Sequence, residues 1–338
     1  MRFIDFNRKS GYREAIMTVP KTILVTGCAG FIGSNFVKTF SERFPETDVI
    51  GIDNFSTGRR DAVLPKIVFY EGSVLDSGLL EKVFAKHQPK YVFHFAAIPR
   101  VSYSVEHPRE TTENNIIGTV ALLEASKNHS VKRFVYSSSS SVYGGAAKTP
   151  TKESDNPPNP KSPYAFQKYA GEQLCQMSSE LYGIDTVSLR YFNVFGPGQY
   201  GDSAYASVIS GWLEAIYFPD KNKNPFIEGD GEQSRDFCYV DNVVEANILA
   251  MRHPNPLKGD VFNIAYGERT SVNQTRRLIE EMTGRKLNLE QRPTRAGDIK
   301  HSHADISKAR EMLGYDPKVN FKEGLKRTIA WYQQRSDK

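Results

Sequence analysis

The chain has 338 residues, of which 39% are hydrophobic and 25% charged, and its formal net charge is +5. These values describe an ordinary globular protein with ample core. The sequence contains no run of five like charges, which argues against a nucleic-acid-binding tail. No apolar stretch approaches the 18 residues of a membrane span, and three isolated cysteines form neither a disulfide framework nor a CxxC metal motif, so we expect a cytoplasmic protein. Residues 1–19 form a polar extension without the apolar core of a signal peptide.

From residue 20 onward, short runs rich in valine, isoleucine and phenylalanine alternate with segments of helical periodicity. The apolar runs are 22–27, 48–53, 67–72, 91–97, 133–139 and 185–193, and the helical segments are 31–43, 77–86, 111–128 and 163–182. Strands that are apolar on both faces and joined by helices predict a parallel sheet covered on both sides. We therefore expect an α/β fold. A Rossmann-type doubly wound sheet would span 20–193 and be joined by 236–265, and a smaller C-terminal substrate-binding region would be formed by 194–235 and 266–338.

The turn after the first strand contains three evenly spaced glycines in LVTGCAGFIGSNF. Gly27 would permit the tight turn, Gly30 would let the backbone approach a pyrophosphate, and Gly33 would let the helix pack closely on the strand. The anion would then lie at the helix N-terminus, where free N–H groups point toward it. Because the spacing is G-x-x-G-x-x-G, the motif is weak on its own, and three glycines in a turn are often purely structural.

The second strand strengthens the interpretation of this turn. It ends in GIDN and places Asp53 20 residues after Gly33. An acid at this point holds the ribose hydroxyls of NAD and repels the 2′-phosphate of NADP. Arg59 and Arg60 could favour NADP, but they lie at least six residues beyond the strand end, so we predict NAD.

Two further segments have residue types suited to proton transfer. The strand at 133–139 runs into five consecutive serines, 137–141, which offer hydroxyl donors at the sheet edge. In SPYAFQK, Ser162 is a suitable N-cap and precedes Pro163, so Tyr164 and Lys168 lie on one face of the helix. A nearby ammonium stabilises a phenolate, and the spacing therefore predicts that Lys168 lowers the pKa of Tyr164 toward neutrality.

Together, TGCAGFIGSN, HFAA, SSSSSVYG and YAFQK resemble the extended short-chain dehydrogenase/reductase superfamily, and LRYFNVFGPGQ and GDGEQSRDFCYVDN narrow the resemblance to nucleotide-sugar 4-epimerases over about residues 20–335. The resemblance implies that Tyr164 is the base, that Lys168 is its partner and a cofactor ligand, and that Ser139 donates to the sugar O4. Ser139 stands four residues before Tyr143, and a shift of register by one serine is the open alternative.

The resemblance also implies two sets of binding residues. Those for NAD are Gly27, Gly30, Phe31, Ile32, Gly33, Asp53, Asn54, Ser73, Val74, Phe95, Ala96, Ala97, Asn115, Ser137, Tyr164, Lys168 and Tyr191. Those for the UDP-sugar are Ser139, Asn193, Ala206, Ser207, Val208, Arg235, Arg295, Asp298 and Ser302. Ser73 departs from the family pattern, in which an aspartate contacts the adenine, so one adenine hydrogen bond is expected to be weaker or made differently.

The implied reaction removes the C4 hydroxyl proton and a hydride, lets the 4-keto sugar turn over, and returns the hydride to its other face. Ser302 lies where galactose-restricted relatives have a bulky tyrosine, so we expect room for an N-acetyl group. The expected pairs are UDP-GlcNAc with UDP-GalNAc and also UDP-Glc with UDP-Gal.

The sequence also leaves other functions open and predicts the oligomeric state and the roles of three histidines. The chain could instead be a UDP-glucuronate decarboxylase or 4-epimerase, or an NAD-sensing module without catalysis. The family expectation is a homodimer. His94 is expected to be a core residue, and His301 and His303 flank Ser302 without a ligand cluster, so no metal is expected.

Overall fold

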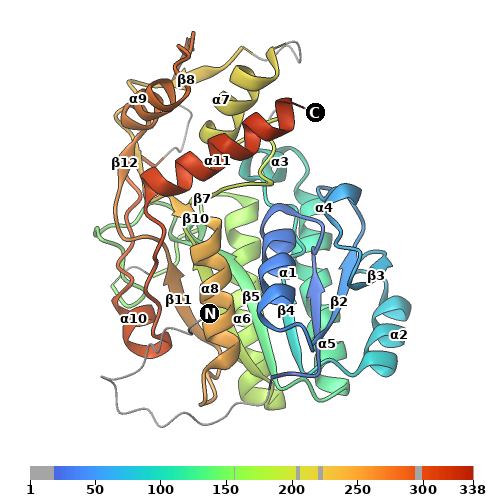
Figure 1. The fold of residues 1–338 in the computed structure, drawn as a ribbon. Coiled ribbons are helices and arrows are strands. Elements are labelled where there is room, and N and C mark those ends of the chain that lie inside the picture. The colour runs from blue at the N-terminus through green and yellow to red at the C-terminus, as the bar shows by residue number, and fades with distance from the viewer. Residues whose placement is uncertain (1–18, 156, 203–205, 220–223, 294–298, 338) are drawn as a thin grey trace, which may run out of the picture.

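The computed structural model describes residues 19–155, 157–202, 206–219, 224–293 and 299–337. A seven-stranded sheet forms the centre of the molecule, and all of its strand pairs are parallel (Figure 1). In the order across the sheet, the strands are β11 (Asp260–Ile264), β6 (Asp185–Tyr191), β5 (Arg133–Ser139), β4 (Tyr91–His94), β1 (Thr22–Thr26), β2 (Asp48–Asp53) and β3 (Val68–Glu71). The predicted α/β fold with a doubly wound parallel sheet is therefore confirmed.

Helices cover both faces of this sheet. On one face α1 packs against α8, and on the other face α5 packs against α2 and α6. These helices are α1 (Phe31–Arg43), α2 (Ser77–His87), α5 (Gly118–Asn128), α6 (Pro163–Tyr182) and α8 (Val240–Arg252). Successive strand residues enter opposite apolar clusters: Ile23 and Val25 belong to one and Leu24 to the other. This alternation explains why the strands are apolar on both faces.

The predicted helix at 111–128 is interrupted in the structure. It consists of α4 (Pro108–Thr112), a π-helical turn at Glu113–Ile117 and α5, and α3 (Val101–Glu106) precedes it. The π turn directs Asn115 inward, where its side chain accepts from the Ile98 amide at 2.8 Å and donates to Gln167 Oε1 at 2.8 Å. The extra residue in this turn is thus explained by a buried amide that finds partners on two other segments.

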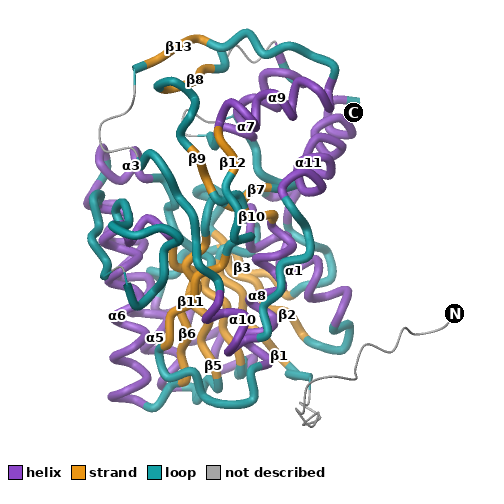
Figure 2. The backbone as a smooth tube through the Cα atoms, turned by 90° about the vertical axis from the view of Figure 1, so that its left-hand side faces the viewer, coloured by secondary structure: helices purple, strands orange, loops and turns teal. Residues whose placement is uncertain are grey.

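A smaller region lies above the carboxyl ends of the sheet strands, where α7, α9 and α11 gather (Figure 2). Its apolar cluster includes Trp212, Leu325 and Tyr332. The helices are α7 (Val208–Tyr217), α9 (Val272–Thr283) and α11 (Phe321–Ser336), and α10 (Ser307–Leu313) packs below them on β11. The short strands pair as β7 (Val194–Phe195) with β10 (Cys238–Tyr239), β9 (Ser234–Arg235) with β12 (Thr270–Ser271), and β8 (Phe226–Glu228) with β13 (Glu290–Arg292).

Two short 3₁₀ turns complete the described elements, η1 (Arg60–Ala62) and η3 (Ser140–Tyr143). His94 is a buried core residue, as predicted, and its ring nitrogens contact the hydroxyls of Thr26 and Thr119 at 2.8 and 2.9 Å. Among the described residues, the helices are too short or too polar to cross a membrane.

Candidate active site

A cleft of about 1050 Å³ separates the carboxyl ends of the sheet strands from the smaller region. Its lining joins the glycine turn after β1, the ends of β4, β5 and β6, and segments around residues 193–202, 206–210, 235 and 299–302. This volume exceeds that of most single small-molecule sites, so the cleft has room for two ligands side by side. In open parallel sheets, ligands bind at this end of the strands.

The three glycines of the first turn meet different surroundings. Gly27 has a φ of +72°, and a Cβ there would lie 2.6 Å from the Ala96 backbone nitrogen. A Cβ on Gly33 would lie 2.0 Å from the Gly27 carbonyl oxygen, whereas a Cβ on Gly30 would meet only that oxygen, at 3.3 Å. Gly27 and Gly33 are thus required by packing. Gly30 borders the cleft and precedes α1, which supports its proposed role beside a pyrophosphate.

Asp53 ends β2 beside this turn and is largely buried. Its carboxylate accepts from the Ala29 amide at 2.9 Å and from the Phe55 amide at 2.8 Å. Burial raises the pKa of the Asp53 carboxyl, and the two amide hydrogen bonds oppose the rise. The carboxylate therefore both supports the glycine turn and faces the cleft, where it can accept from ribose hydroxyls.

The arginines that could have favoured NADP have acidic partners of their own. Arg59 lies 3.3 Å from the Asp202 carboxylate, and its guanidinium stacks on the Tyr200 ring at 4.1 Å. Arg60 pairs with Glu71 at 2.6 Å and is not part of the cleft lining. Arg59 borders the cleft and Arg60 does not, so the position of Arg60 supports the preference for NAD over NADP.

The residues predicted to carry out the chemistry meet where β5 ends. Ser162 caps α6 by accepting from the Ala165 amide at 3.2 Å, and Tyr164 in the first turn lies beside the Ser139 side chain. Lys168 extends from the next turn and donates to the Ser137 carbonyl at 2.7 Å. The three side chains border the same cleft.

The prediction that Lys168 lowers the pKa of Tyr164 is wrong for the protein without bound NAD. Burial raises the pKa of Tyr164 to about 12, although the neighbouring Ser139 side chain opposes the rise. Burial likewise lowers the pKa of Lys168 to about 8. The Lys168 ammonium is directed to the Ser137 carbonyl, so desolvation dominates at Tyr164. A phenolate there needs more positive charge, which the oxidised nicotinamide of NAD carries.

The proposed substrate residues Asn193, Arg235 and Ser302 border the cleft from the other side. Asn193 Nδ2 lies 3.5 Å from Ser302 Oγ, and Arg235 donates to the Ile299 carbonyl at 2.6 Å. Asp236 holds this wall together, since its carboxylate accepts from the amides of Tyr266 and Ala304 at 3.1 Å each.

Most of the remaining sequence-derived residues also border the cleft. These are Phe31, Ile32, Asn54, Val74, Phe95, Ala96, Ala97, Ser137, Tyr191, Ala206 and Ser207. The structure does not bring Ser73, Asn115 or Val208 to the lining. The Ser73 hydroxyl accepts from the Leu75 amide at 3.1 Å, so it serves a local turn. Arg295 and Asp298 lie outside the described residues.

Among the lining residues that sequence reasoning missed are Asn114 and Arg100. Asn114 borders the cleft in place of Asn115, because the π turn moves the register by one residue. Arg100 follows HFAA at the end of β4 and also borders the cleft, and its positive charge after a strand end was an available signal. No cluster of histidine, cysteine or acidic residues able to hold a metal ion occurs in the part of the chain that the structure describes.

Comparisons with known proteins indicate the family of the chain. The model of the NAD-dependent epimerase/dehydratase family matches residues 23–265. The crystal structure of UDP-glucose 4-epimerase from Thermotoga maritima with UDP-glucose is 39% identical, with a TM-score of 0.86 over 93% of this chain and 99% of that one. UDP-N-acetylglucosamine 4-epimerase from Methanobrevibacter ruminantium, solved with UDP-N-acetylmuramic acid, is 38% identical, with a TM-score of 0.85 over the same shares.

A third solved structure contains the cofactor. UDP-glucuronic acid 4-epimerase from Bacillus cereus, in complex with UDP-glucuronic acid and NAD, is 32% identical, with a TM-score of 0.83 over 93% of this chain and 99% of that one. The three relatives share one reaction, inversion at C4 of a UDP-sugar, and differ in the sugar. Similarity alone therefore indicates the chemistry and NAD, and the sugar has to be argued from the residues of the cleft.

Proposed function

The chain belongs to the NAD-dependent epimerase/dehydratase family, and we propose that it interconverts the C4 epimers of UDP-sugars, with UDP-GlcNAc and UDP-GalNAc as a pair that it accepts. The observation that carries the proposal is the meeting of Ser139, Tyr164 and Lys168 at the strand end that faces the glycine turn across one cleft. An NAD-sensing module would not need a tyrosine, a lysine and a serine together at this point.

Each residue of this group has a distinct part in the reaction. Tyr164, as phenolate, accepts the C4 hydroxyl proton while NAD takes the C4 hydride, and it later returns that proton. Ser139 lies beside Tyr164 and hydrogen-bonds the sugar O4, so it keeps the two oxygens aligned. Lys168 supplies positive charge beside the strand end and donates hydrogen bonds there. Between the two transfers the 4-keto sugar rotates, while the UDP portion stays held.

The wall of the cleft opposite Tyr164 is suited to holding the UDP portion while the sugar rotates. Arg235 offers a guanidinium whose planar fork matches phosphate oxygens, and Asn193 adds an amide. Arg295 and Asp298 are proposed to complete the UDP site on the strength of their sequence positions. Ser302 is small and only partly buried, so the space beside it can take a bulky substituent at C2 of the sugar.

The choice of sugar is tested with UDP-GlcNAc, UDP-Glc and UDP-GlcA, with the products resolved by chromatography. We expect UDP-GalNAc and UDP-Gal from the first two. Ser302→Tyr should abolish turnover of UDP-GlcNAc and spare UDP-Glc, because an added ring clashes only with the larger sugar. The matched control Ser302→Ala should still turn over UDP-GlcNAc, since it keeps the space.

Other outcomes of the same panel select the alternatives. If the parent protein ignores UDP-GlcNAc, or if Ser302→Tyr affects both sugars alike, the proposal for the N-acetylated pair is wrong. Conversion of UDP-GlcA to its C4 epimer would select the UDP-glucuronate 4-epimerase alternative, for which the Bacillus cereus relative is the precedent. Conversion of UDP-GlcA to a UDP-pentose would select the decarboxylase alternative.

We also propose that two copies pair through α5 and α6. The outer face of α6 exposes Phe166, Met177 and Leu181, the π turn before α5 exposes Ile117, and α5 exposes Val120. In α6 this face is opposite to the one that carries Tyr164 and Lys168, so pairing leaves the cleft open. A cluster of large apolar side chains on two adjacent helices is suited to a self-complementary interface.

The three cysteines support the proposal of a cytoplasmic enzyme. Cys28, Cys175 and Cys238 are all buried free thiols. Burial raises the pKa of the Cys28 thiol to about 12, so it stays protonated at neutral pH. Unpaired thiols of this kind are typical of a reducing compartment.

A further inference from the structure

The inner face of α6 carries a third titratable residue, one turn beyond Lys168. Tyr164, Lys168 and Glu172 are spaced by four residues and so lie along one face of the helix. Glu172 is only 1% exposed. Its carboxylate accepts from Arg190 of β6 through two bonds, Nε to Oε1 at 2.8 Å and Nη2 to Oε2 at 2.7 Å, and from the Ser138 hydroxyl at 2.5 Å.

This contact completes a pattern between α6 and the end of β5. The Ser137 carbonyl accepts from Lys168, and the Ser138 hydroxyl donates to Glu172. Two consecutive serines therefore each contact one residue of the α6 face. A slip of one residue along β5 would break both contacts at once, because it would also turn the Ser138 side chain to the other face of the sheet. Glu172 thus helps to fix which serine meets Tyr164.

Glu172 also places a buried carboxylate one helical turn from Lys168 on the same face of α6. Other titratable groups packed around the two residues are neutral near pH 8, because burial shifts their pKa away from that range. They are His94 from β4, Tyr136 from β5, Tyr143 from η3, Tyr191 from β6, and Tyr164 and Cys175 from α6. Arg190 stays charged, and Glu153 interacts with it at longer range, its own pKa raised by burial.

We propose that Glu172 is a positioning residue for the C4 epimerisation: it holds Ser138 in register and places a negative charge one helical turn from Lys168. The inference rests on the proposed function for the part that concerns turnover. Burial lowers the pKa of Lys168 to about 8, and Glu172 opposes that fall. Removal of the carboxylate would leave Lys168 and Arg190 as two buried cations without a counter-charge, so Lys168 would lose its proton at a lower pH.

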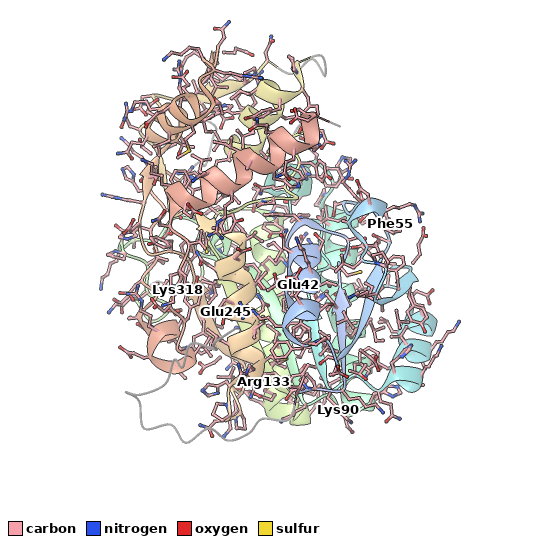
Figure 3. All side chains as sticks on the ribbon, viewed as in Figure 1. Glu42, Phe55, Lys90, Arg133, Glu245 and Lys318 are labelled. Atoms are coloured by element: carbon pink, nitrogen blue, oxygen red, sulfur yellow. The ribbon has the colours of Figure 1, made fainter. Side chains whose placement is uncertain are left out.

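The chain contains a matched control at the other end of the same two strands. Arg133 and Asp185 begin β5 and β6, lie opposite each other in the sheet, and form a buried pair at 2.6 Å. Figure 3 labels Arg133 at the end of the sheet remote from the smaller region. Five residues of strand, about 16 Å, separate Arg133 from Ser138. A defect that comes only from breaking a buried ion pair should therefore appear in both pairs alike.

The experiment compares wild type, Glu172→Gln, Glu172→Asp and Asp185→Asn as NAD-loaded proteins. We expect the alkaline limb of the kcat profile with UDP-GlcNAc to fall by about one pH unit in Glu172→Gln, with about a tenfold loss of kcat at pH 8.5. Glu172→Asp keeps the charge and should keep the limb. Asp185→Asn should lose thermal stability but keep the limb of the wild type.

A second readout does not depend on turnover. The loss of Tm in Glu172→Gln should be larger at pH 7, where Lys168 is charged, than at pH 9, where it is not. The loss in Asp185→Asn should be equal at both pH values. If Glu172→Gln does not fold, the double variant Glu172→Gln/Arg190→Gln removes the uncompensated arginine and takes its place in both measurements.

Equal Tm losses at pH 7 and pH 9, or an unmoved alkaline limb in a folded Glu172→Gln protein, would overturn the inference. Failure of the proposed function would look different. The wild type would then epimerise no UDP-sugar, while the pH dependence of the Tm losses would still decide whether Glu172 and Lys168 are coupled.

Discussion

Substitutions in the glycine turn can distinguish Gly30, which faces the proposed cofactor site, from Gly33, which packing requires to be glycine. Gly30→Ala places a methyl group at the edge of the cleft, 3.3 Å from the nearest protein atom outside its neighbours. Its φ of −78° and ψ of 171° suit any residue, so the cost in stability is that of alanine in place of glycine at an N-cap, about 1 kcal/mol or less. The same methyl would stand between the backbone and a pyrophosphate. We expect NAD affinity to fall at least tenfold, or about 1.4 kcal/mol.

Gly33→Ala should behave in the opposite way. Its Cβ would lie 2.0 Å from the Gly27 carbonyl oxygen, which must retreat by more than about 1 Å to reach an ordinary contact. We expect a loss of about 3 kcal/mol or more, because backbone rather than a flexible side chain has to move. Gly284→Ala is the control for left-handed backbone alone, since its φ is +66° and no atom lies within 4 Å. It should cost about 1–2 kcal/mol.

The assay combines urea unfolding of each variant with the NAD content of the purified protein and a calorimetric titration with NAD. The reasoning predicts that Gly30→Ala is stable and binds NAD weakly, while Gly284→Ala is modestly destabilised and binds NAD normally. Normal NAD binding by Gly30→Ala would refute the assignment of this position to the cofactor. A loss of stability in Gly30→Ala as large as in Gly33→Ala would show that the turn is governed by packing alone.

Two further predictions concern the base and the assembly. Tyr164→Phe keeps the ring and removes the proton acceptor, so kcat should drop by about 10²–10⁴ while UDP-sugar binding in calorimetry persists; near-normal turnover would exclude Tyr164 as the base. Light scattering should give twice the chain mass. The double variant Met177→Glu/Leu181→Glu should be a folded monomer, because pairing would bury the two added charges in the proposed interface. An unchanged mass of this variant would place the interface elsewhere.

Local patterns predicted the parts of the protein that depend on local physics. Apolar runs on both faces of the strands indicated the parallel sheet, because helices cover both sides of it. The glycine turn and Tyr164 with Lys168 could be placed because each depends on a spacing within a single turn or helix. The short strands of the smaller region could not, since β9 pairs with β12 and β8 with β13 across long intervals of chain.

The differences in the site come from partners that are distant in sequence. Asn115 turns inward because Ile98 and Gln167 satisfy its amide, and neither is visible from the helical period around it. The pKa of Tyr164 rises because it is buried, and burial depends on the packing of the whole cleft. Glu172 gains its importance from Arg190, which the sheet topology brings opposite it from another strand.

The central claim is that the hydride taken from C4 returns to the same carbon on its other face. UDP-GlcNAc carrying deuterium at C4 tests it most directly, with the product examined by mass spectrometry and NMR. We expect UDP-GalNAc that retains the deuterium at C4, without accumulation of NADH. Deuterium lost to water, or a product that is not the C4 epimer, would contradict the account.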